Sequence, residues 1–146
     1  MPRIKKFDHV GITVADLDAV TKFFVSLGMH VAGRVDGMEG EFLETVCGIP
    51  GSRTNVVMLL AEDGATGIEL SSFERPDHGP GQPEAMANEL GIRNVAFEVE
   101  DLRGMVAGLQ AEGYELVGGI GEYQDSWQMA YVRGPEGILV ALAQPI

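Results

Sequence analysis

Residues 7–33 read FDHVGITVADLDAVTKFFVSLGMHVAG, and residues 92–118 repeat this pattern without a gap as IRNVAFEVEDLRGMVAGLQAEGYELVG. The matched pairs, each 85 positions apart (95 − 10), include Val10 and Val95, Asp16 and Asp101, and Gly28 and Gly113. Self-similarity in one register is the mark of a repeated supersecondary unit. The chain is therefore predicted to contain two copies of one module.

Each copy begins with the signals of a strand followed by a helix. Val10, Ile12 and Val14 alternate with more polar residues, which is the pattern of a half-buried strand. Asp16 then suits a helix N-cap, and Gly28 suits the left-handed residue that follows a helix. The second copy carries the same signals and ends its helix at Gly113.

Three further strands are predicted after each helix, so each module reads strand-helix-strand-strand-strand. Their expected ranges are 29–36, 54–62 and 66–73 in the first copy, and 114–119, 126–133 and 137–143 in the second. The predicted fold class is α+β, with two βαβββ modules that form a curved mixed sheet around a cleft. A single domain, 1–146, is expected to comprise module one (4–73), a Pro- and Gly-rich linker (74–91) and module two (92–145).

Composition excludes several function classes. The formal charge of −12 and the pI of about 4.5 disfavour nucleic acid and anionic membranes as partners, because both repel an acidic surface. No window is apolar enough for a membrane span, and the N-terminus lacks the apolar stretch of a signal peptide. The single cysteine, Cys47, allows no internal disulfide, which is typical of a reducing compartment. The expected location is the cytoplasm.

The quoted stretches resemble the vicinal oxygen chelate superfamily, the family of glyoxalases, bleomycin resistance proteins and dioxygenases. FDHVGITVADL and IRNVAFEVEDL are similar to its two opening strands, and GIELSSF (67–73) to its fourth strand. YQDSWQMAYVRGPEGILVALAQ (123–144) is similar to its closing strands. The resemblance covers residues 4–145. It implies the glyoxalase/bleomycin-resistance/dioxygenase fold, a small-molecule ligand and a homodimer.

In metal-using members the first and fourth strands of both modules supply the ligands, so the resemblance implies metal roles for His9, Glu69 and Asn94. An imidazole and a carboxylate suit Zn, Fe, Mn or Ni. The second module departs from the pattern. Asn94 stands where His is common, and Ala141 stands where Glu is common. Whether a metal is present is left open, because a hydrogen-bonded His–Glu pair without a metal fits the residues equally well.

The second module also carries candidates for catalysis and for substrate binding. Glu98 and Glu122 are carboxylates that could transfer a proton. The predicted substrate-binding residues are Tyr123, Trp127, Met129, Tyr131 and Arg133, of which the last four share one face of a strand. Apolar walls with one arginine suit an organic anion. An interface between copies would favour the same residue types.

An enzyme that keeps the fold and uses acidic residues of the cleft without a metal is one open possibility, and two further functions remain open at this point. The first is a metal-dependent enzyme, a glyoxalase-like lyase, an isomerase or epimerase, or a dioxygenase, acting on a small organic substrate with a partly degraded metal site. The second is a non-catalytic protein of the bleomycin-resistance type that binds an antibiotic or an aromatic anion. Asn94 and Ala141 favour the second, and the His9–Glu69 pair favours the first.

Overall fold

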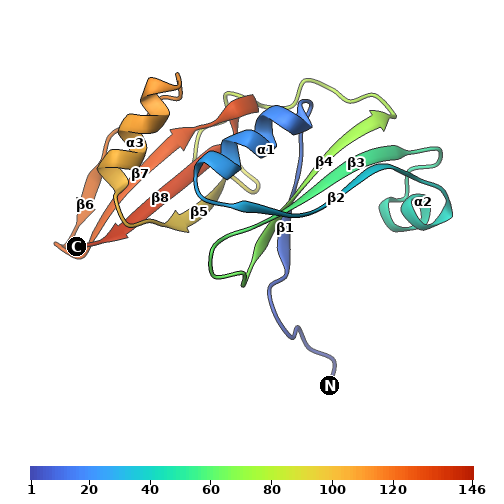
Figure 1. The fold of residues 1–146 in the computed structure, drawn as a ribbon, viewed down its shortest axis with the longest axis horizontal. Coiled ribbons are helices and arrows are strands. Elements are labelled where there is room, and N and C mark those ends of the chain that lie inside the picture. Colours follow the sequence, from blue (N-terminus) through green and yellow to red (C-terminus); the bar gives the residue numbers. More distant parts are fainter. The chain divides into compact units, whose positions relative to one another are not determined.

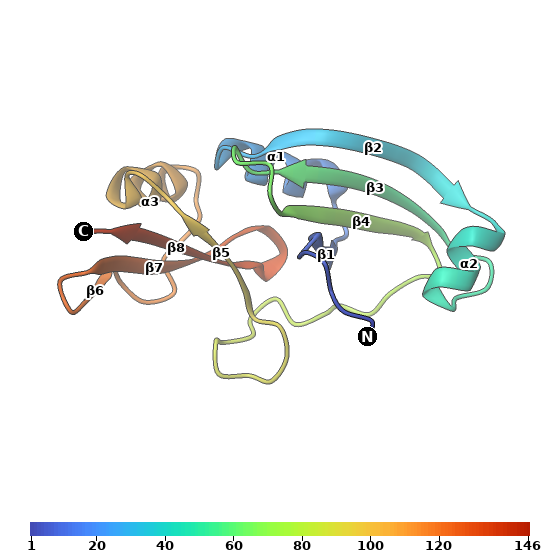
Figure 2. The ribbon, with the colours of Figure 1, turned by 90° about the horizontal axis from the view of Figure 1, so that it is seen from below.

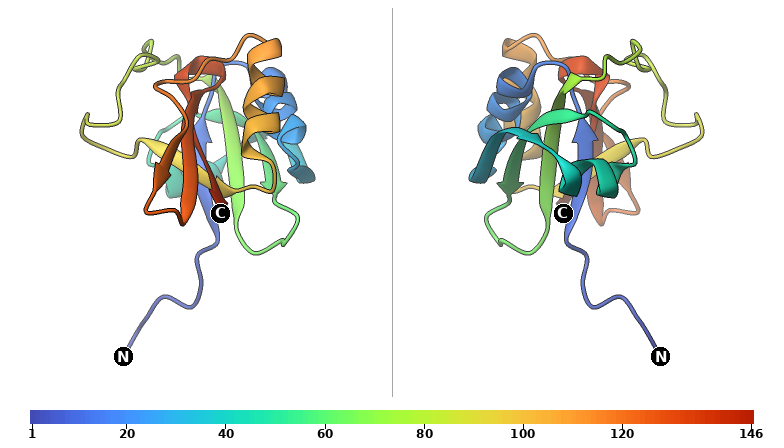
Figure 3. Two further views of the ribbon diagram at one scale, coloured as in Figure 1. Left: turned by 90° about the vertical axis from the view of Figure 1, so that its left-hand side faces the viewer. Right: turned by 90° about the vertical axis from the view of Figure 1, so that its right-hand side faces the viewer.

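The computed structural model describes residues 1–146, which form two compact units, 1–79 and 80–146 (Figure 1). The first unit contains β1 (His9–Thr13), α1 (Leu17–Ser26), β2 (His30–Glu39), α2 (Glu41–Cys47), β3 (Arg53–Leu60) and β4 (Gly67–Arg75). The second contains β5 (Asn94–Glu98), α3 (Leu102–Ala111), β6 (Gly121–Tyr123), β7 (Trp127–Arg133), a 3₁₀ turn at Pro135–Gly137 and β8 (Leu139–Pro145). Residues 1–8 precede β1 as a segment without regular structure (Figure 3).

Both units have the same topology. The strand orders are β1-β4-β3-β2 and β5-β8-β7-β6, and in each sheet the first pair is parallel and the other two are antiparallel. This confirms the predicted α+β class with two βαβββ modules, each of which forms its own four-stranded mixed sheet. Figure 2 shows both sheets with their helices.

The register of the two parallel strand pairs shows how much longer the first module is than the second. His9 pairs with Gly67 in the first sheet, and Asn94 pairs with Leu139 in the second. These partners are 58 positions apart in the first module and 45 apart in the second, a difference of 13 (58 − 45). The excess lies in the excursion that carries α2, a helix without a counterpart in the second module.

Capping and amphipathic spacing explain both long helices. Asp16 Oδ1 accepts the Ala19 amide at 3.0 Å, and Asp101 Oδ1 accepts the Gly104 amide at 3.0 Å, as predicted for N-cap residues. Gly28 and Gly113 follow the helices with φ of 110° and 94°. No helix in the chain is long and apolar enough to cross a membrane.

The helices α1 and α3 each cover one face of their own sheet and build a small core there. The first core consists of Leu17, Val20, Phe23, Phe24, Val57, Leu59, Ile68 and Leu70. The second consists of Leu102, Val106, Leu109, Ala130, Val132, Val140 and Leu142. Strand alternation turns the remaining side chains to the other side, which we call the helix-free face of each sheet.

One predicted strand is wrong. The range 114–119 forms only an isolated bridge between Leu116 and Val132, and the edge strand is β6, further along the chain. The backbone of Val117 still donates to Tyr131 at 2.9 Å, so the segment begins to pair with β7. Gly118 and Gly119 follow directly. Two consecutive glycines weaken a strand because glycine loses more conformational entropy on folding than other residues and has no side chain to pack.

Candidate functional site

The sequence-predicted metal residues of the first module lie on the helix-free face of its sheet. Glu69 pairs with Gly11 in the β1–β4 ladder. Gly11 lies two residues after His9, so His9 and Glu69 are on the same face of the sheet. His9 Nε2 lies 3.5 Å from Glu69 Oε2, and the two side chains are 34% and 33% exposed. The structure therefore brings the imidazole and the carboxylate together where a small ligand can reach both.

A second carboxylate, not predicted from the sequence, contacts the same imidazole. His9 Nδ1 lies 2.7 Å from Asp8 Oδ2, and this hydrogen bond is the main reason why the pKa of Asp8 lies below its ordinary value. An ionised carboxylate can only accept, so Nδ1 is the donor and Nε2 faces Glu69. Carboxylate–histidine pairs of this kind orient metal-ligating imidazoles. The signal in the sequence was an acidic residue directly before the histidine.

The equivalent positions of the second module carry different chemistry. Ala96 pairs with Ala141 as Gly11 pairs with Glu69, so the register identifies Ala141 as the counterpart of Glu69. Ala141 is buried and offers only a methyl group. Asn94, the counterpart of His9, donates from Nδ2 to the Tyr131 hydroxyl at 3.4 Å.

These donors do not fit the four-residue metal set that the family resemblance implies. His9 and Glu69 supply two strong ligands, Asn94 supplies a weak amide oxygen, and Ala141 supplies none. No three His, Cys, Asp or Glu side chains are grouped so that they could hold a metal ion. The arrangement supplies at most a two-ligand site within the first module.

The predicted substrate-binding residues of β7 share the helix-free face of the second sheet. In the β7–β8 ladder Tyr131 pairs with Ala141, Met129 with Ala143, and Trp127 with Pro145. Trp127 and Met129 are 37% and 41% exposed, and Tyr123 of β6 pairs with Trp127. We call Trp127, Met129 and Tyr131 the β7 row. It lies beside the short side chains of β8.

Arg133 continues this row, but its guanidinium has partners in the chain itself. Nη1 donates to the carbonyl oxygens of Pro83 at 3.0 Å and Gly137 at 3.3 Å, and Nη2 donates to that of Ala85 at 3.0 Å. Nη2 also lies 3.6 Å from Met86 Sδ. The side chain thus holds segment 83–86 against the end of β7.

The two predicted catalytic carboxylates lie on opposite faces of the second sheet. Glu98 pairs with Ala143, which places it on the helix-free face with the β7 row. Glu122 pairs with Gln128 and accepts a hydrogen bond of 3.4 Å from its Nε2, on the side that α3 covers. The structure does not bring the two together, because adjacent residues of a strand such as Glu122 and Tyr123 point to opposite sides.

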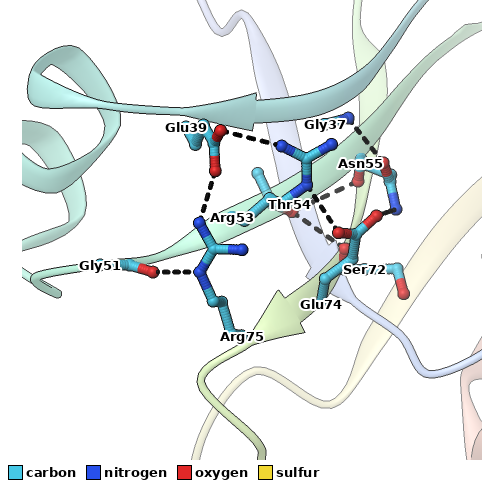
Figure 4. Close-up of polar contacts among 9 residues, drawn as sticks. All are labelled: Gly37, Glu39, Gly51, Arg53, Thr54, Asn55, Ser72, Glu74 and Arg75. Carbon is cyan, nitrogen blue, oxygen red and sulfur yellow. Dashed lines mark hydrogen bonds and ion pairs between the residues drawn. The ribbon is translucent and has the colours of Figure 1, made fainter.

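The largest polar network of the first module was not predicted from the sequence (Figure 4). Arg53 contacts Glu39 at 3.0 Å and Glu74 at 2.6 Å, and Arg75 contacts Glu39 and the Gly51 carbonyl oxygen. We call Glu39, Arg53, Glu74 and Arg75 the Arg53 cluster. It joins the end of β2, the start of β3 and the end of β4. The first two are the points where the chain leaves the sheet toward α2 and returns from it. No short window of sequence could reveal it, because its members come from β2, β3 and β4.

Fold and sequence together identify the class of this protein. The family model for the glyoxalase/bleomycin resistance protein/dioxygenase superfamily matches residues 6–142, and the chain belongs to that superfamily. A solved glyoxalase family protein from Bacillus cereus is 36% identical, with a TM-score of 0.95 over 99% of this chain and 97% of that one. A search of curated proteins gave no match.

More distant structures share the fold alone. An antibiotic-binding protein from Streptomyces, TnmS3, is 18% identical, with a TM-score of 0.67 over the full length of both chains. The fosfomycin resistance protein FosX from Listeria monocytogenes is 14% identical, with a TM-score of 0.66 over 99% of this chain and 96% of that one.

Proposed function

We propose that this protein binds a small organic molecule on the helix-free face of its second sheet. The observation that carries the proposal is the β7 row beside β8, where large side chains border a strip of small ones. The strip consists of Ala141 and Ala143, which pair directly with Tyr131 and Met129. Aromatic and sulfur-containing side chains supply apolar contact area at little cost in conformational entropy. Ala141 is buried, so the accessible end of the strip is Ala143, beside the partly exposed Met129 and Trp127. A planar ligand lying over Ala143 would contact the row at its edge.

The chemistry of the neighbouring positions supports a binding role. Ala141 removes a ligand position that metal-using relatives are expected to have, and Asn94 donates its amide to Tyr131. That hydrogen bond also fixes the ring of Tyr131 beside the alanine strip. One distant structure of the same fold is described as an antibiotic-binding protein, an analogy at the level of fold only.

Trp127 makes the proposal directly testable, because it is the only tryptophan of the chain. A ¹H–¹⁵N correlation spectrum therefore contains one side-chain indole signal. In a screen of aromatic fragments, we expect binders to shift this signal in the wild type. Calorimetry, which does not need the indole, should show that they lose affinity in Trp127→Ala and Tyr131→Ala variants. Binders that shift only amides of the first module, and that bind both variants normally, would place the site elsewhere.

A metal-dependent enzyme is the second candidate, and the His9–Glu69 pair is the observation that favours it. Here His9 and Glu69 would hold two positions of a divalent ion, and Glu98 would serve as the acid–base group. The candidate reactions are those of a lyase, an isomerase, an epimerase or a dioxygenase. Elemental analysis of untagged protein purified without chelators tests this candidate. Near-stoichiometric Zn, Fe, Mn or Ni would favour it over the binding role.

A further inference from the structure

We propose that the molecule bound beside the β7 row is an organic cation that carries an aromatic ring, and that Glu98 recognises its positive charge. This inference rests on the proposed binding function and names the ligand class for the same face. It reverses the charge expected from the sequence, where Arg133 suggested an anion. Of the charged groups on this face, Arg133 is engaged by the chain itself and Glu98 is free.

The terminal nitrogens of Arg133 are already engaged, which disfavours the paired contact that an anion would make with them. Both terminal nitrogens of its guanidinium already donate to backbone carbonyl oxygens, those of Pro83, Ala85 and Gly137. Releasing Arg133 to a ligand would leave these carbonyl oxygens without their charged donor. Hydrogen bonds to charged groups are among the stronger ones in proteins, so the exchange is unfavourable.

Glu98 is the free carboxyl group on the helix-free face of the second sheet. It is exposed, and within the second module neither a hydrogen bond nor an ion pair engages its carboxylate. The registers Glu98–Ala143 and Ala143–Met129 place it in line with Met129, across the central strand. Two strand spacings separate these backbones, about 10 Å. An aromatic ring with a short cationic arm spans that distance.

The net charge of the second unit also favours a cationic ligand. Residues 80–146 contain three basic residues, Arg93, Arg103 and Arg133, and ten acidic ones, which gives a formal charge of −7 (3 − 10). Arg103 lies on α3, which covers the other face, and Arg93 precedes β5 with its Nε buried. The face therefore attracts cations and repels anions.

The side chains of the β7 row suit a cation as well. Indole and phenol rings attract organic cations through their π faces, most strongly for tryptophan. Trp127 and Tyr131 are both on this face, and Trp127 is partly exposed. Ala143 lies between Glu98 and Met129 in the two ladders, so a ligand with its ring over Ala143 would place its charge between the carboxylate and the aromatic side chains.

Three matched probes test the proposal at pH 7: 2-naphthylmethylamine, which is a cation, 2-naphthalenemethanol, which is neutral, and 2-naphthoate, which is an anion. The Trp127 indole signal reports the Kd of each. We expect the cation to bind about three- to tenfold more tightly than the alcohol, and the anion to bind most weakly. Raising the salt concentration should narrow these differences.

Two variants separate specific recognition from the general acidity of the chain. Glu98→Gln should bring the amine and the alcohol to similar affinities. Glu112→Gln removes the same charge at the end of α3, on the covered side, and should leave the preference intact. Equal binding of all three probes to the wild type, or an unchanged preference in Glu98→Gln, would overturn the cation proposal while the binding function stands.

Two other outcomes would overturn both proposals. One is that no probe shifts the Trp127 signal at millimolar concentration. The other is that the protein is a dimer in light scattering and Trp127→Ala makes it a monomer. In that case a second copy of the chain, and not a ligand, covers this face.

Discussion

The backbone of Pro83 lies directly against Gly137, so close that residue 137 has room for a hydrogen atom and not for a β-carbon. A β-carbon there would overlap the Pro83 carbonyl oxygen and would lie within about 2.5 Å of its carbonyl carbon. Gly137 also has φ of 81°, a left-handed conformation that favours glycine. The 3₁₀ turn between β7 and β8 thus packs against segment 83–86, to which Arg133 also donates hydrogen bonds.

Gly137→Ala should therefore destabilise the protein strongly. The left-handed conformation costs an alanine about 1–2 kcal/mol, and displacement of the Pro83 backbone adds to this. We expect a loss of at least about 2 kcal/mol in the free energy of unfolding, measured by urea denaturation.

Gly108→Ala is the matched control. Gly108 lies in α3, where an added β-carbon meets nothing within 4 Å. Alanine is the better helix former, so this change should stabilise the protein by about 0.5–1 kcal/mol. If both variants shifted stability in the same direction, the close approach of Pro83 and Gly137 would not explain the loss.

Arg133→Lys tests whether this arginine acts through the chain or through a ligand. Lysine keeps the charge but lacks the planar fork that reaches Pro83, Ala85 and Gly137 together. We expect a loss of about 1–2 kcal/mol in unfolding free energy, with the preference among the three naphthyl probes retained. Unchanged stability combined with weaker binding of 2-naphthoate would instead show that Arg133 contacts an anion.

The repeat explains why the sequence predicted so much of the fold. Alternation along β1 and β5, the Asp16 and Asp101 caps and the glycines after both helices are local signals, and they determined the element order and the faces of the strands. The shared face of His9 and Glu69, and that of the β7 row, followed from the same alternation.

The partners of charged side chains could not be predicted in this way. Arg133 contacts residues 83–86, some fifty positions away, and the Arg53 cluster joins three separate strands. Such contacts depend on register and loop path, which residue spacing does not report. The role expected for Arg133 was drawn from the chemistry of its side chain alone, and its hydrogen bonds lead to a different proposal.

Metal affinity tests the second candidate function residue by residue. His9→Ala should abolish binding of Zn²⁺ measured by calorimetry, because it removes one of the two strong ligands. Asp8→Asn should weaken binding about tenfold, since its hydrogen bond orients the imidazole. Asp63→Asn, in the turn between β3 and β4, is the control. Equal affinity in the wild type and His9→Ala would remove His9 from any metal site.

The Arg53 cluster should make part of the stability of the first module depend on pH. The pKa of Glu39 is held below its ordinary value of 4.5 mainly by the hydrogen bond from Arg53, and that of Glu74 mainly by the hydrogen bond from Asn55. Because both are lower in the folded state, the stabilisation is complete above about pH 4.5 and is lost as the pH falls through the folded values. The stability difference between wild type and Glu39→Gln should therefore be largest near pH 7 and shrink steadily below pH 4.5.

Urea denaturation at low protein concentration measures this difference, with Glu62→Gln as the control in an exposed turn. A difference that stayed constant down to pH 3 would show that Glu39 contributes through packing and not through its ionised pairs.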